Sequence, residues 1–380
     1  MRHYIKLISL IIPMAALVVS YQQCSGVNFQ NANQRVQWSQ DCQNDPSKCR
    51  EVTETFNSGT SNKKIDFTWI IDNSASMSNE ISTVRNNMAT FANRISQYAD
   101  LKMAVISAKD SATNPGNKYQ SSPYYINLQD VGLPSQMTKQ VNSLVKSTDA
   151  LILGALALCP SSGLDPNSWC AKFQDQKLDD ANRNVMNYKN GDFWRDVYAP
   201  TVSSLGDFLR PQSHKVFVIV TDDDAGSHHG DHFHIKTNNF LNAYNSRFPN
   251  AQPVVYSIIQ PKANNPRCNT HYQGAEYMKL SNVTNGGYFD ICESNWSPFF
   301  EEMLDGIETL AKTSFPLATV NIIDILSVKI YNPNNPGSKR ELFPGEYTLN
   351  NRTLTVREDI IESLGYLNFQ VDIKILEYSN

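Results

Sequence analysis

The chain has 380 residues, of which 33 are basic, 37 are acidic and 41% are hydrophobic, and its formal net charge is −4. This length and composition are typical of a globular protein with one large domain and a smaller one. The sequence contains no basic stretch, which argues against nucleic acid as a partner. Beyond the N-terminal segment, no apolar run is long enough to span a bilayer.

The first 23 residues have the pattern of an export signal. Residues 7–19 are almost wholly apolar, and this length suits a secretory signal peptide better than a membrane span. Val18-x-Ser20 offers small residues for ordinary cleavage, whereas Cys24 resembles the acceptor cysteine of a bacterial lipoprotein. We expect an exported bacterial protein with a signal peptide over 1–23. It is either a lipoprotein of the outer membrane, facing the periplasm or the surface, or a secreted soluble protein.

The cysteine count agrees with lipidation of Cys24, because the other six cysteines form three local couples. Six cysteines permit many connectivities, so local pairing is an expectation only. None of the couples has the CxxC spacing of a zinc or redox site, which favours structural disulfides in an oxidising compartment. The expected disulfides are Cys42–Cys49, Cys159–Cys170 and Cys268–Cys292.

Residues 24–62 are rich in Asn, Gln and Ser and poor in aliphatic side chains. Such a segment buries too little apolar surface to fold alone, so we expect a flexible tether.

Residues 63–315 alternate between strand and helix patterns. Strands are expected over 65–71, 101–107, 122–128, 215–221, 253–260 and 287–292, and helices over 79–98, 137–158 with a break at 147–149, 194–209, 235–248, 276–284 and 296–312. This alternation predicts an α/β domain with a doubly wound, mostly parallel sheet.

Residues 316–380 show period-two alternation over 321–331, 346–349, 353–357 and 367–378, with Asn350-Asn351 as a hairpin turn. We expect a small antiparallel β domain that serves in support, spacing or protein contact.

Two of the predicted parallel strands run directly into oxygen-bearing side chains. Asp72, Ser74 and Ser76 follow the strand over 65–71, and Asp222 follows the strand over 215–221. Carboxyl ends of parallel strands share one edge, where open α/β sheets bind ligands. Thr148 lies between these segments and adds a further oxygen. The set suits a hard divalent cation, with Mg²⁺ expected and Mn²⁺ or Ca²⁺ as alternatives. The alternative is that the serines merely cap the next helix.

A histidine-rich loop lies beside the second acidic turn. It contains His228, His229, His232 and His234, and the turn itself adds Asp223 and Asp224. Such spacing can bind zinc, copper or nickel, but a solvated polar loop is the simpler interpretation.

The pattern DNSAS, followed by a threonine loop and a strand ending in Thr221-Asp222, resembles the metal-ion-dependent adhesion site of von Willebrand factor type A domains. The resemblance covers roughly residues 63–312 and is similar in detail to exported bacterial type A lipoproteins, through FLRP at 208–211, YSII at 256–259, GG at 286–287, DIC at 290–292 and Trp296. It implies that the metal ligands are Asp72, Ser74, Ser76, Thr148 and Asp222, and that Asp223 or Asp224 contributes to metal binding together with Asp222.

In that family the site does no chemistry, and a partner's Glu or Asp carboxylate completes the metal's ligands. The resemblance therefore implies a non-enzymatic adhesion or interaction module of the cell envelope. Its partner would be a protein, with membrane contact through a lipid anchor only and with no small-molecule substrate. The alternative is a metal-dependent hydrolase that uses the turn at 222–224 and the histidine loop. The absence of Gly-x-Ser-x-Gly, HExxH and P-loop motifs argues against this alternative.

Overall fold

The structure is a computed structural model. It describes residues 29–57, 63–109, 125–159, 205–225, 237–248, 251–262, 273–319, 321–350, 352–364 and 369–379, except for 133, 144, 146–149 and 212. The chain divides into two compact units, and their residues interleave along the sequence. One unit is drawn from Met1–Glu54, Thr319–Val328 and Ile373–Asn380, and the other from Thr55–Ala318 and Lys329–Asp372.

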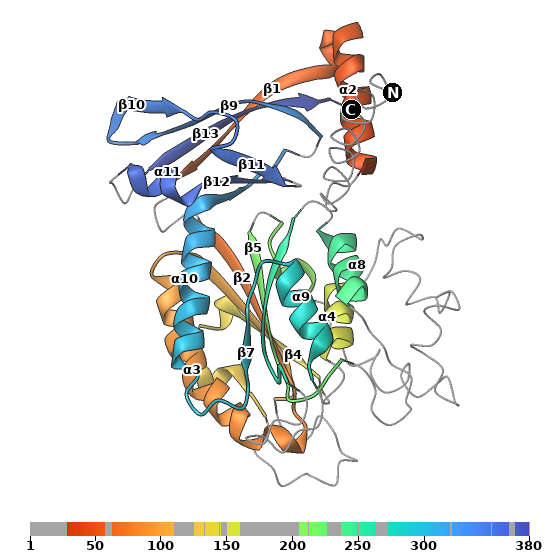
Figure 1. Ribbon diagram of the computed structural model, residues 1–380, viewed down its shortest axis with the longest axis vertical. Coiled ribbons are helices and arrows are strands. Elements are labelled where there is room, and N and C mark those ends of the chain that lie inside the picture. Colours follow the sequence, from red (N-terminus) through yellow and green to blue (C-terminus); the bar gives the residue numbers. More distant parts are fainter. Residues whose placement is uncertain are drawn as a thin grey trace, which may run out of the picture. The chain divides into compact units, whose positions relative to one another are not determined.

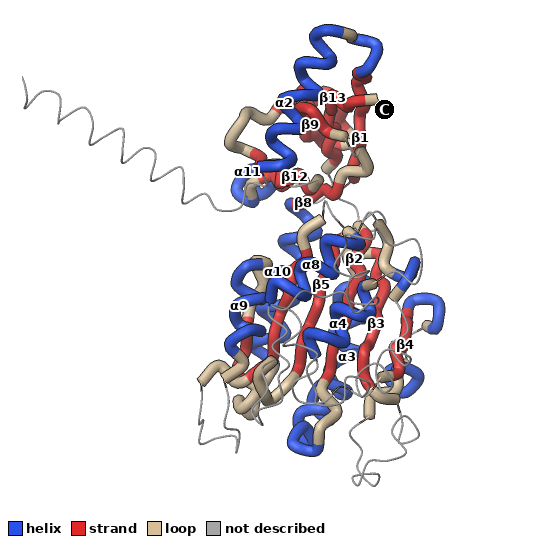
Figure 2. Tube along the Cα trace, turned by 90° about the vertical axis from the view of Figure 1, so that its right-hand side faces the viewer, coloured by secondary structure: helices blue, strands red, loops and turns tan. Residues whose placement is uncertain are grey.

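The second unit is built on a six-stranded sheet in which all neighbouring strands are parallel. The strands are β2 (Lys64–Ile71), β3 (Asp100–Ser107), β4 (Thr138–Asn142), β5 (His214–Val220), β6 (Pro253–Ile259) and β7 (Tyr288–Asp290), in the order β4-β3-β2-β5-β6-β7. Figure 2 shows β4 at one edge of this sheet. The order reverses between β2 and β5, because the chain builds outward from β2 in one direction and from β5 in the other.

Helices cover both faces of this sheet (Figure 1). The helices α3 (Ser78–Ser96) and α10 (Ser297–Thr313) pack on one face, and α4 (Ala150–Leu158), α8 (Thr237–Arg247) and α9 (Ala275–Val283) pack on the other. Because both faces are covered, the central strands are apolar almost throughout, as parallel strands usually are. All seven residues of β5 are buried. The expectation of a mixed α/β architecture with a parallel sheet is confirmed.

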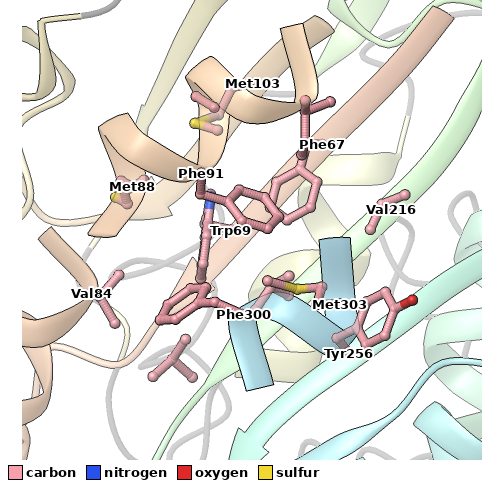
Figure 3. Close-up of a cluster of buried hydrophobic side chains, with 14 of the residues drawn as sticks. Phe67, Trp69, Val84, Met88, Phe91, Met103, Val216, Tyr256, Phe300 and Met303 are labelled. Atoms are coloured by element: carbon pink, nitrogen blue, oxygen red, sulfur yellow. The ribbon is translucent and has the colours of Figure 1, made fainter. Parts of the chain in front are cut away.

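Several aromatic side chains meet in the core beneath α3 and α10, among aliphatic side chains and methionines (Figure 3). Phe67 and Trp69 point to the same face of β2 because they are two residues apart. Phe91 of α3 lies between them and Phe300 of α10, with ring centroids 4.9 Å from Phe67 and 6.0 Å from Phe300. This cluster packs one face of β2 against both helices and so fixes the position of the turn that follows β2.

Two further sheets lie outside the parallel one. A four-stranded sheet has the order β1-β13-β9-β10, with β1 at Cys49–Asn57, β13 at Gln370–Tyr378, β9 at Ile322–Asn332 and β10 at Asn335–Glu341. A three-stranded antiparallel sheet has the order β11-β12-β8, with β11 at Tyr347–Asn350, β12 at Thr353–Val356 and β8 at Ser314–Pro316. The remaining helices are α2 (Phe29–Asn44) and α11 (Glu358–Ser363), with 3-10 turns at Pro46–Lys48, Ala75–Met77, Leu128–Val131, Ser135–Met137 and Gly206–Phe208. In the described segments, no helix combines the length and apolarity that crossing a membrane requires.

Three expectations differ from this architecture. The segment 24–62 was expected to be a tether, yet it contains α2 and β1, and β1 is a member of the four-stranded sheet. The third strand of the parallel sheet is β4, so the first part of the expected helix over 137–158 is a strand. Of the strand expected over 122–128, the described residues 125–128 form a loop and the start of a 3-10 turn. The predicted domain boundary at 315/316 does not coincide with the division into units. The expected helix over 194–209 lies largely outside the described residues, which contain only the 3-10 turn at Gly206–Phe208 there.

Distant pairing explains these differences. Trp38 of α2 stacks on Tyr378 of β13 with ring centroids 5.6 Å apart, and the disulfide Cys42–Cys49 joins α2 to β1. These contacts stabilise a segment whose own composition is too polar to fold alone. In β4 only Val141 is buried, so the pairing with β3, and not an apolar run, makes this segment a strand.

Candidate functional site

The turns after β2 and β5 meet at the edge formed by the carboxyl ends of the parallel strands, here called the carboxyl edge. Ile71 and Val220, the last residues of β2 and β5, are register partners, and the Asp72 N–H donates to the Val220 carbonyl oxygen at 2.9 Å. Asp72 and Asp222 therefore follow adjacent strands, at the point where the strand order reverses. In open α/β sheets this switch point is the usual place for a ligand.

Asp72 is held by hydrogen bonds to both of its carboxyl oxygens. The Ser74 backbone N–H donates to Oδ1 at 2.7 Å, and the Thr221 hydroxyl donates to Oδ2 at 2.9 Å. Ser74 Oγ and Ser76 Oγ lie 2.9 Å apart. Asp72 is fully buried, Ser74 is partly buried and Ser76 is exposed. The arrangement thus places a rigid carboxyl group beneath a pair of hydroxyls that solvent can reach.

The carboxyl groups of Asp72 and Asp222 repel each other when both are ionised. Burial raises the pKa of Asp72 well above its usual value, the charge of Asp222 raises it further, and the hydrogen bonds from Ser74 and Thr221 oppose the rise. Burial also raises the pKa of Asp222 to about 6, against a hydrogen bond from Ser76 that lowers it. Two neighbouring carboxyl groups in a desolvated place resist ionising together unless a cation compensates them.

Asn73 links three segments beneath the site, and spacing in the sequence does not indicate this role. Its Oδ1 accepts from the backbone N–H of Ala108 at 2.8 Å and of Val145 at 3.3 Å, and its Nδ2 donates to Ser107 Oγ at 2.8 Å. Its own N–H donates to the Val145 carbonyl oxygen at 2.7 Å. One buried amide therefore joins the turn after β2 to the end of β3 and to the segment after β4.

Glu80 is a second residue near the site that the motif did not indicate. It lies in the first turn of α3, and its charge contributes to the raised pKa of Asp222. Among the described residues, no group forms a hydrogen bond with its buried Oε2. Glu80 follows Ser76 by four residues, about one helical turn, which is the only signal in the sequence that places it beside the motif.

In the rest of the acidic turn, backbone N–H groups donate hydrogen bonds to side chains of the same turn. The Asp223 N–H donates to Thr221 Oγ1 at 3.3 Å, and the Asp224 N–H donates to Asp223 Oδ1 at 3.0 Å. Both side chains are partly exposed. The other expected site residues lie outside the described residues: Cys24, Thr148, His228, His229, His232 and His234.

The donor set decides which cation fits. Asp72, Asp222, Ser74 and Ser76 present oxygen only, which suits Mg²⁺, Mn²⁺ or Ca²⁺, whereas zinc favours nitrogen and sulfur. Within the described segments, no three or more His, Cys, Asp or Glu side chains are grouped as a metal site. Two carboxyls with uncharged hydroxyls are a different kind of donor set, and its chemistry fits a hard cation that keeps open positions.

The expected disulfides are observed in part. Cys42 and Cys49 are bonded, with Cα atoms 5.7 Å apart. Cys159 and Cys292 are also disulfide-bonded, and their expected partners Cys170 and Cys268 lie outside the described residues.

No protein-family model matches the chain, and no curated protein matches it. Among solved structures, it is similar to the pilus adhesin SpaC from Lactobacillus rhamnosus GG in its open conformation, with 10% identity and a TM-score of 0.32. That similarity covers 88% of this chain and 41% of the adhesin. A second structure of the same adhesin gives 11% identity and a TM-score of 0.31, over 88% of this chain and 42% of the adhesin. The chain thus spans about two fifths of the adhesin's length, and a likeness this distant assigns neither fold nor function.

Proposed function

We propose that this protein is an exported interaction module of the von Willebrand factor type A kind, which binds a partner protein's Glu or Asp carboxylate through a divalent cation. The ligands are Asp72, Ser74, Ser76 and Asp222, with Thr148 from a further loop, and the expected cation is Mg²⁺. The observation that carries the proposal is the meeting of the DNSAS turn with Asp222 at the switch point of the sheet, next to two adjacent hydroxyls.

The chemistry of the donors explains why such a site would attract a carboxylate. Among the four proposed ligands from the turns at 72–76 and 222, only Asp72 and Asp222 carry charge, because Ser74 and Ser76 are neutral. A hard cation takes six or more oxygen ligands, so positions remain for water or for a partner's carboxylate. The cation would supply electrostatic attraction, and Asp72 and Thr221 would hold the turn in place while the exposed Ser76 faces solvent.

Asn73 supports this site without touching the cation. Its three buried side-chain hydrogen bonds join the segments that follow β2, β3 and β4. Donors held by a rigid second layer of hydrogen bonds lose little entropy when a ligand arrives.

The disulfide Cys42–Cys49 supports export to an oxidising compartment, because such bonds rarely persist in the cytosol. Lipidation at Cys24 and a place at the outer membrane are part of the same proposal. The hydrolase alternative depends on the histidine loop at 228–234, which lies outside the described residues.

The test is thermal unfolding of the purified protein after chelation with EDTA, with and without added MgCl₂ or MnCl₂. A cation that binds only the folded state at one hundred times its dissociation constant stabilises it by about 2.7 kcal/mol. We expect a clear rise in the midpoint, and we expect the rise to vanish in the double variant Ser74→Ala/Ser76→Ala.

The matched control is Ser96→Ala, an exposed serine at the far end of α3, which should keep the full rise. If neither cation raises the midpoint of the unaltered protein, or if the double variant responds as the unaltered protein does, the proposal is wrong. A partner search with Asp- and Glu-containing peptides follows only if the first result holds.

A further inference from the structure

A groove of about 410 Å³ lies at the opposite ends of the parallel strands from the candidate metal site. It is bounded by the start of β5 and β6, the second half of α10 and the three-stranded sheet β11-β12-β8. Its lining contains no Asp, Glu, Lys or Arg. The one titratable imidazole in it, His214, has a pKa lowered to about 3 by burial and by the nearby charges of Lys63 and Lys215, so it is neutral at neutral pH.

One wall of the groove is a sheet face whose side chains follow from strand register. Thr348 pairs with Thr355, which pairs with Ser314, and Asn350 pairs with Thr353, which pairs with Pro316. Alternate residues of a strand share one face, so these two rows point to the same side, and all six residues line the groove. Leu354 and Val356, at the intervening positions of β12, are buried on the other face. The wall is therefore a ladder of hydroxyl and amide groups.

The wall opposite this sheet face contains the Tyr256 ring and the side-chain amides of Gln252 and Asn285. Tyr256 lines the groove and is 7% exposed, and a side chain at Gly306 would place its Cβ 2.5 Å from the Tyr256 hydroxyl. Glycine at 306 thus lets α10 pass close to this ring. Asn285, another lining residue, has a positive φ of 55°. The Asn350 Nδ2 donates to Gln252 Oε1 at 2.9 Å and so joins the two walls.

Part of the hydrogen-bonding capacity of the groove is unused. Ser314 and Thr355 share a hydrogen bond at 3.3 Å. In contrast, across the described segments the side chains of Thr348, Thr353 and Asn285 form none. A hydroxyl both donates and accepts, and an amide presents two donors and an acceptor. The groove therefore offers a ligand several donors and acceptors without offering it any charge.

We propose that this groove binds a neutral polyhydroxylated ligand, a short saccharide. A charged ligand would find no countercharge in the lining, and an apolar one would leave the hydroxyls of Thr348 and Thr353 without partners. An extended peptide pairs with the edge of a sheet, whereas this wall is a sheet face. The volume lies at the lower end of the range for small-ligand sites, about 300–1,000 Å³. Tyr256 and Leu310 supply apolar surface for the C–H face of a sugar ring.

The test is saturation-transfer NMR on the full-length purified protein, in EDTA so that the result does not depend on the candidate metal site. The probes are glucose, galactose, N-acetylglucosamine, maltose and N,N′-diacetylchitobiose. The key variant is Thr348→Val/Thr353→Val, because valine keeps the β-branched shape and removes the hydroxyl. The matched control is Thr53→Val, an exposed threonine of β1 outside the groove.

We expect at least one of these sugars to bind, and we expect its affinity to fall about tenfold or more in the double variant, the loss that two ordinary hydrogen bonds predict. The control should bind normally, and circular dichroism and the unfolding midpoint should be unchanged in both. The proposal is overturned if no probe binds, or if the double variant binds the sugar as well as the control does. It is also overturned if an uncharged Gly/Ser/Thr hexapeptide binds this groove and the sugars do not.

Discussion

Replacing Asn73 by alanine should destabilise the protein more than any other single change at the carboxyl edge. Asn73 is 4% exposed, and its side chain makes three buried hydrogen bonds, to the backbone N–H groups of Ala108 and Val145 and to the Ser107 hydroxyl. A buried polar group left without a partner costs about 1–3 kcal/mol. The Ser107 hydroxyl would lose one donor and can still donate elsewhere, but the N–H groups of Ala108 and Val145 would lose their acceptor. Asn73→Ala should therefore cost about 2–6 kcal/mol.

Urea unfolding followed by tryptophan fluorescence measures this cost, with the free energy of unfolding taken from the midpoint and slope. Asn79→Ala is the matched control, because Asn79 is exposed in the first turn of α3 and its change should stay within about 0.5 kcal/mol. The same preparation shows whether the stabilisation by Mg²⁺ weakens. An Asn73→Ala protein as stable as the control would refute the argument that this amide joins the three segments.

Three further changes test the energetics of the second unit. Asp222 has a pKa raised from 3.8 to about 6 by burial, so the folded state binds more protons than the unfolded state between these values, and stability falls as pH rises through that window. In EDTA, Asp222→Asn should therefore raise the thermal midpoint at pH 7 and flatten its pH dependence below pH 6; a lower midpoint at pH 7 would contradict this. Lys63 is buried, its Nζ has no hydrogen-bond partner among the described residues, and burial lowers its pKa from 10.5 to about 7. The folded state then binds fewer protons than the unfolded state between those values, so stability rises with pH there. Lys63→Met should raise the thermal midpoint at pH 7 and remove this increase of stability with pH. A loss of stability in Lys63→Met would show that the ammonium is well solvated. Gly286→Ala would place a Cβ 1.9 Å from the Val255 carbonyl oxygen inside β6. Urea unfolding should therefore show a loss of about 1–3 kcal/mol or more in the free energy of unfolding. An unchanged midpoint would mean that β6 can move to make room for the methyl group.

The strands on either side of the switch point could be predicted from the sequence because their signal is local. Residues 65–71 are apolar nearly throughout and 216–220 are a continuous apolar run, and strands buried on both faces require such runs. The helix α3 was predictable because Ile81, Val84, Met88, Phe91 and Ile95 recur at three- and four-residue steps and are all buried. Parallel pairing then follows from the alternation of strands and helices. It places Asp72 and Asp222 on one edge before any coordinate is known.

Edge strands and polar segments could not be predicted in this way. The sequence of β4, Thr-Lys-Gln-Val-Asn, has no apolar run, and its strand conformation comes from pairing with β3. Residues 49–57 form β1 next to β13, which lies more than 300 residues later in the chain. Composition describes what a segment can bury alone, and these segments are stabilised by what distant parts of the chain bring to them.

The amino-acid sequence by itself determined the alternating α/β architecture, the oxygen-rich turn at Asp72, Ser74 and Ser76 and the second turn at Asp222, because hydrophobic period and motif spacing act over short distances. Only the tertiary structure decided that Asn73 supports this edge and that Glu80 lies near Asp222. It also decided that two threonine-bearing strands form one wall of an uncharged groove. These relations depend on which residues meet after the chain has folded, and hydrogen bonds between residues tens of positions apart leave no periodic signal in the sequence.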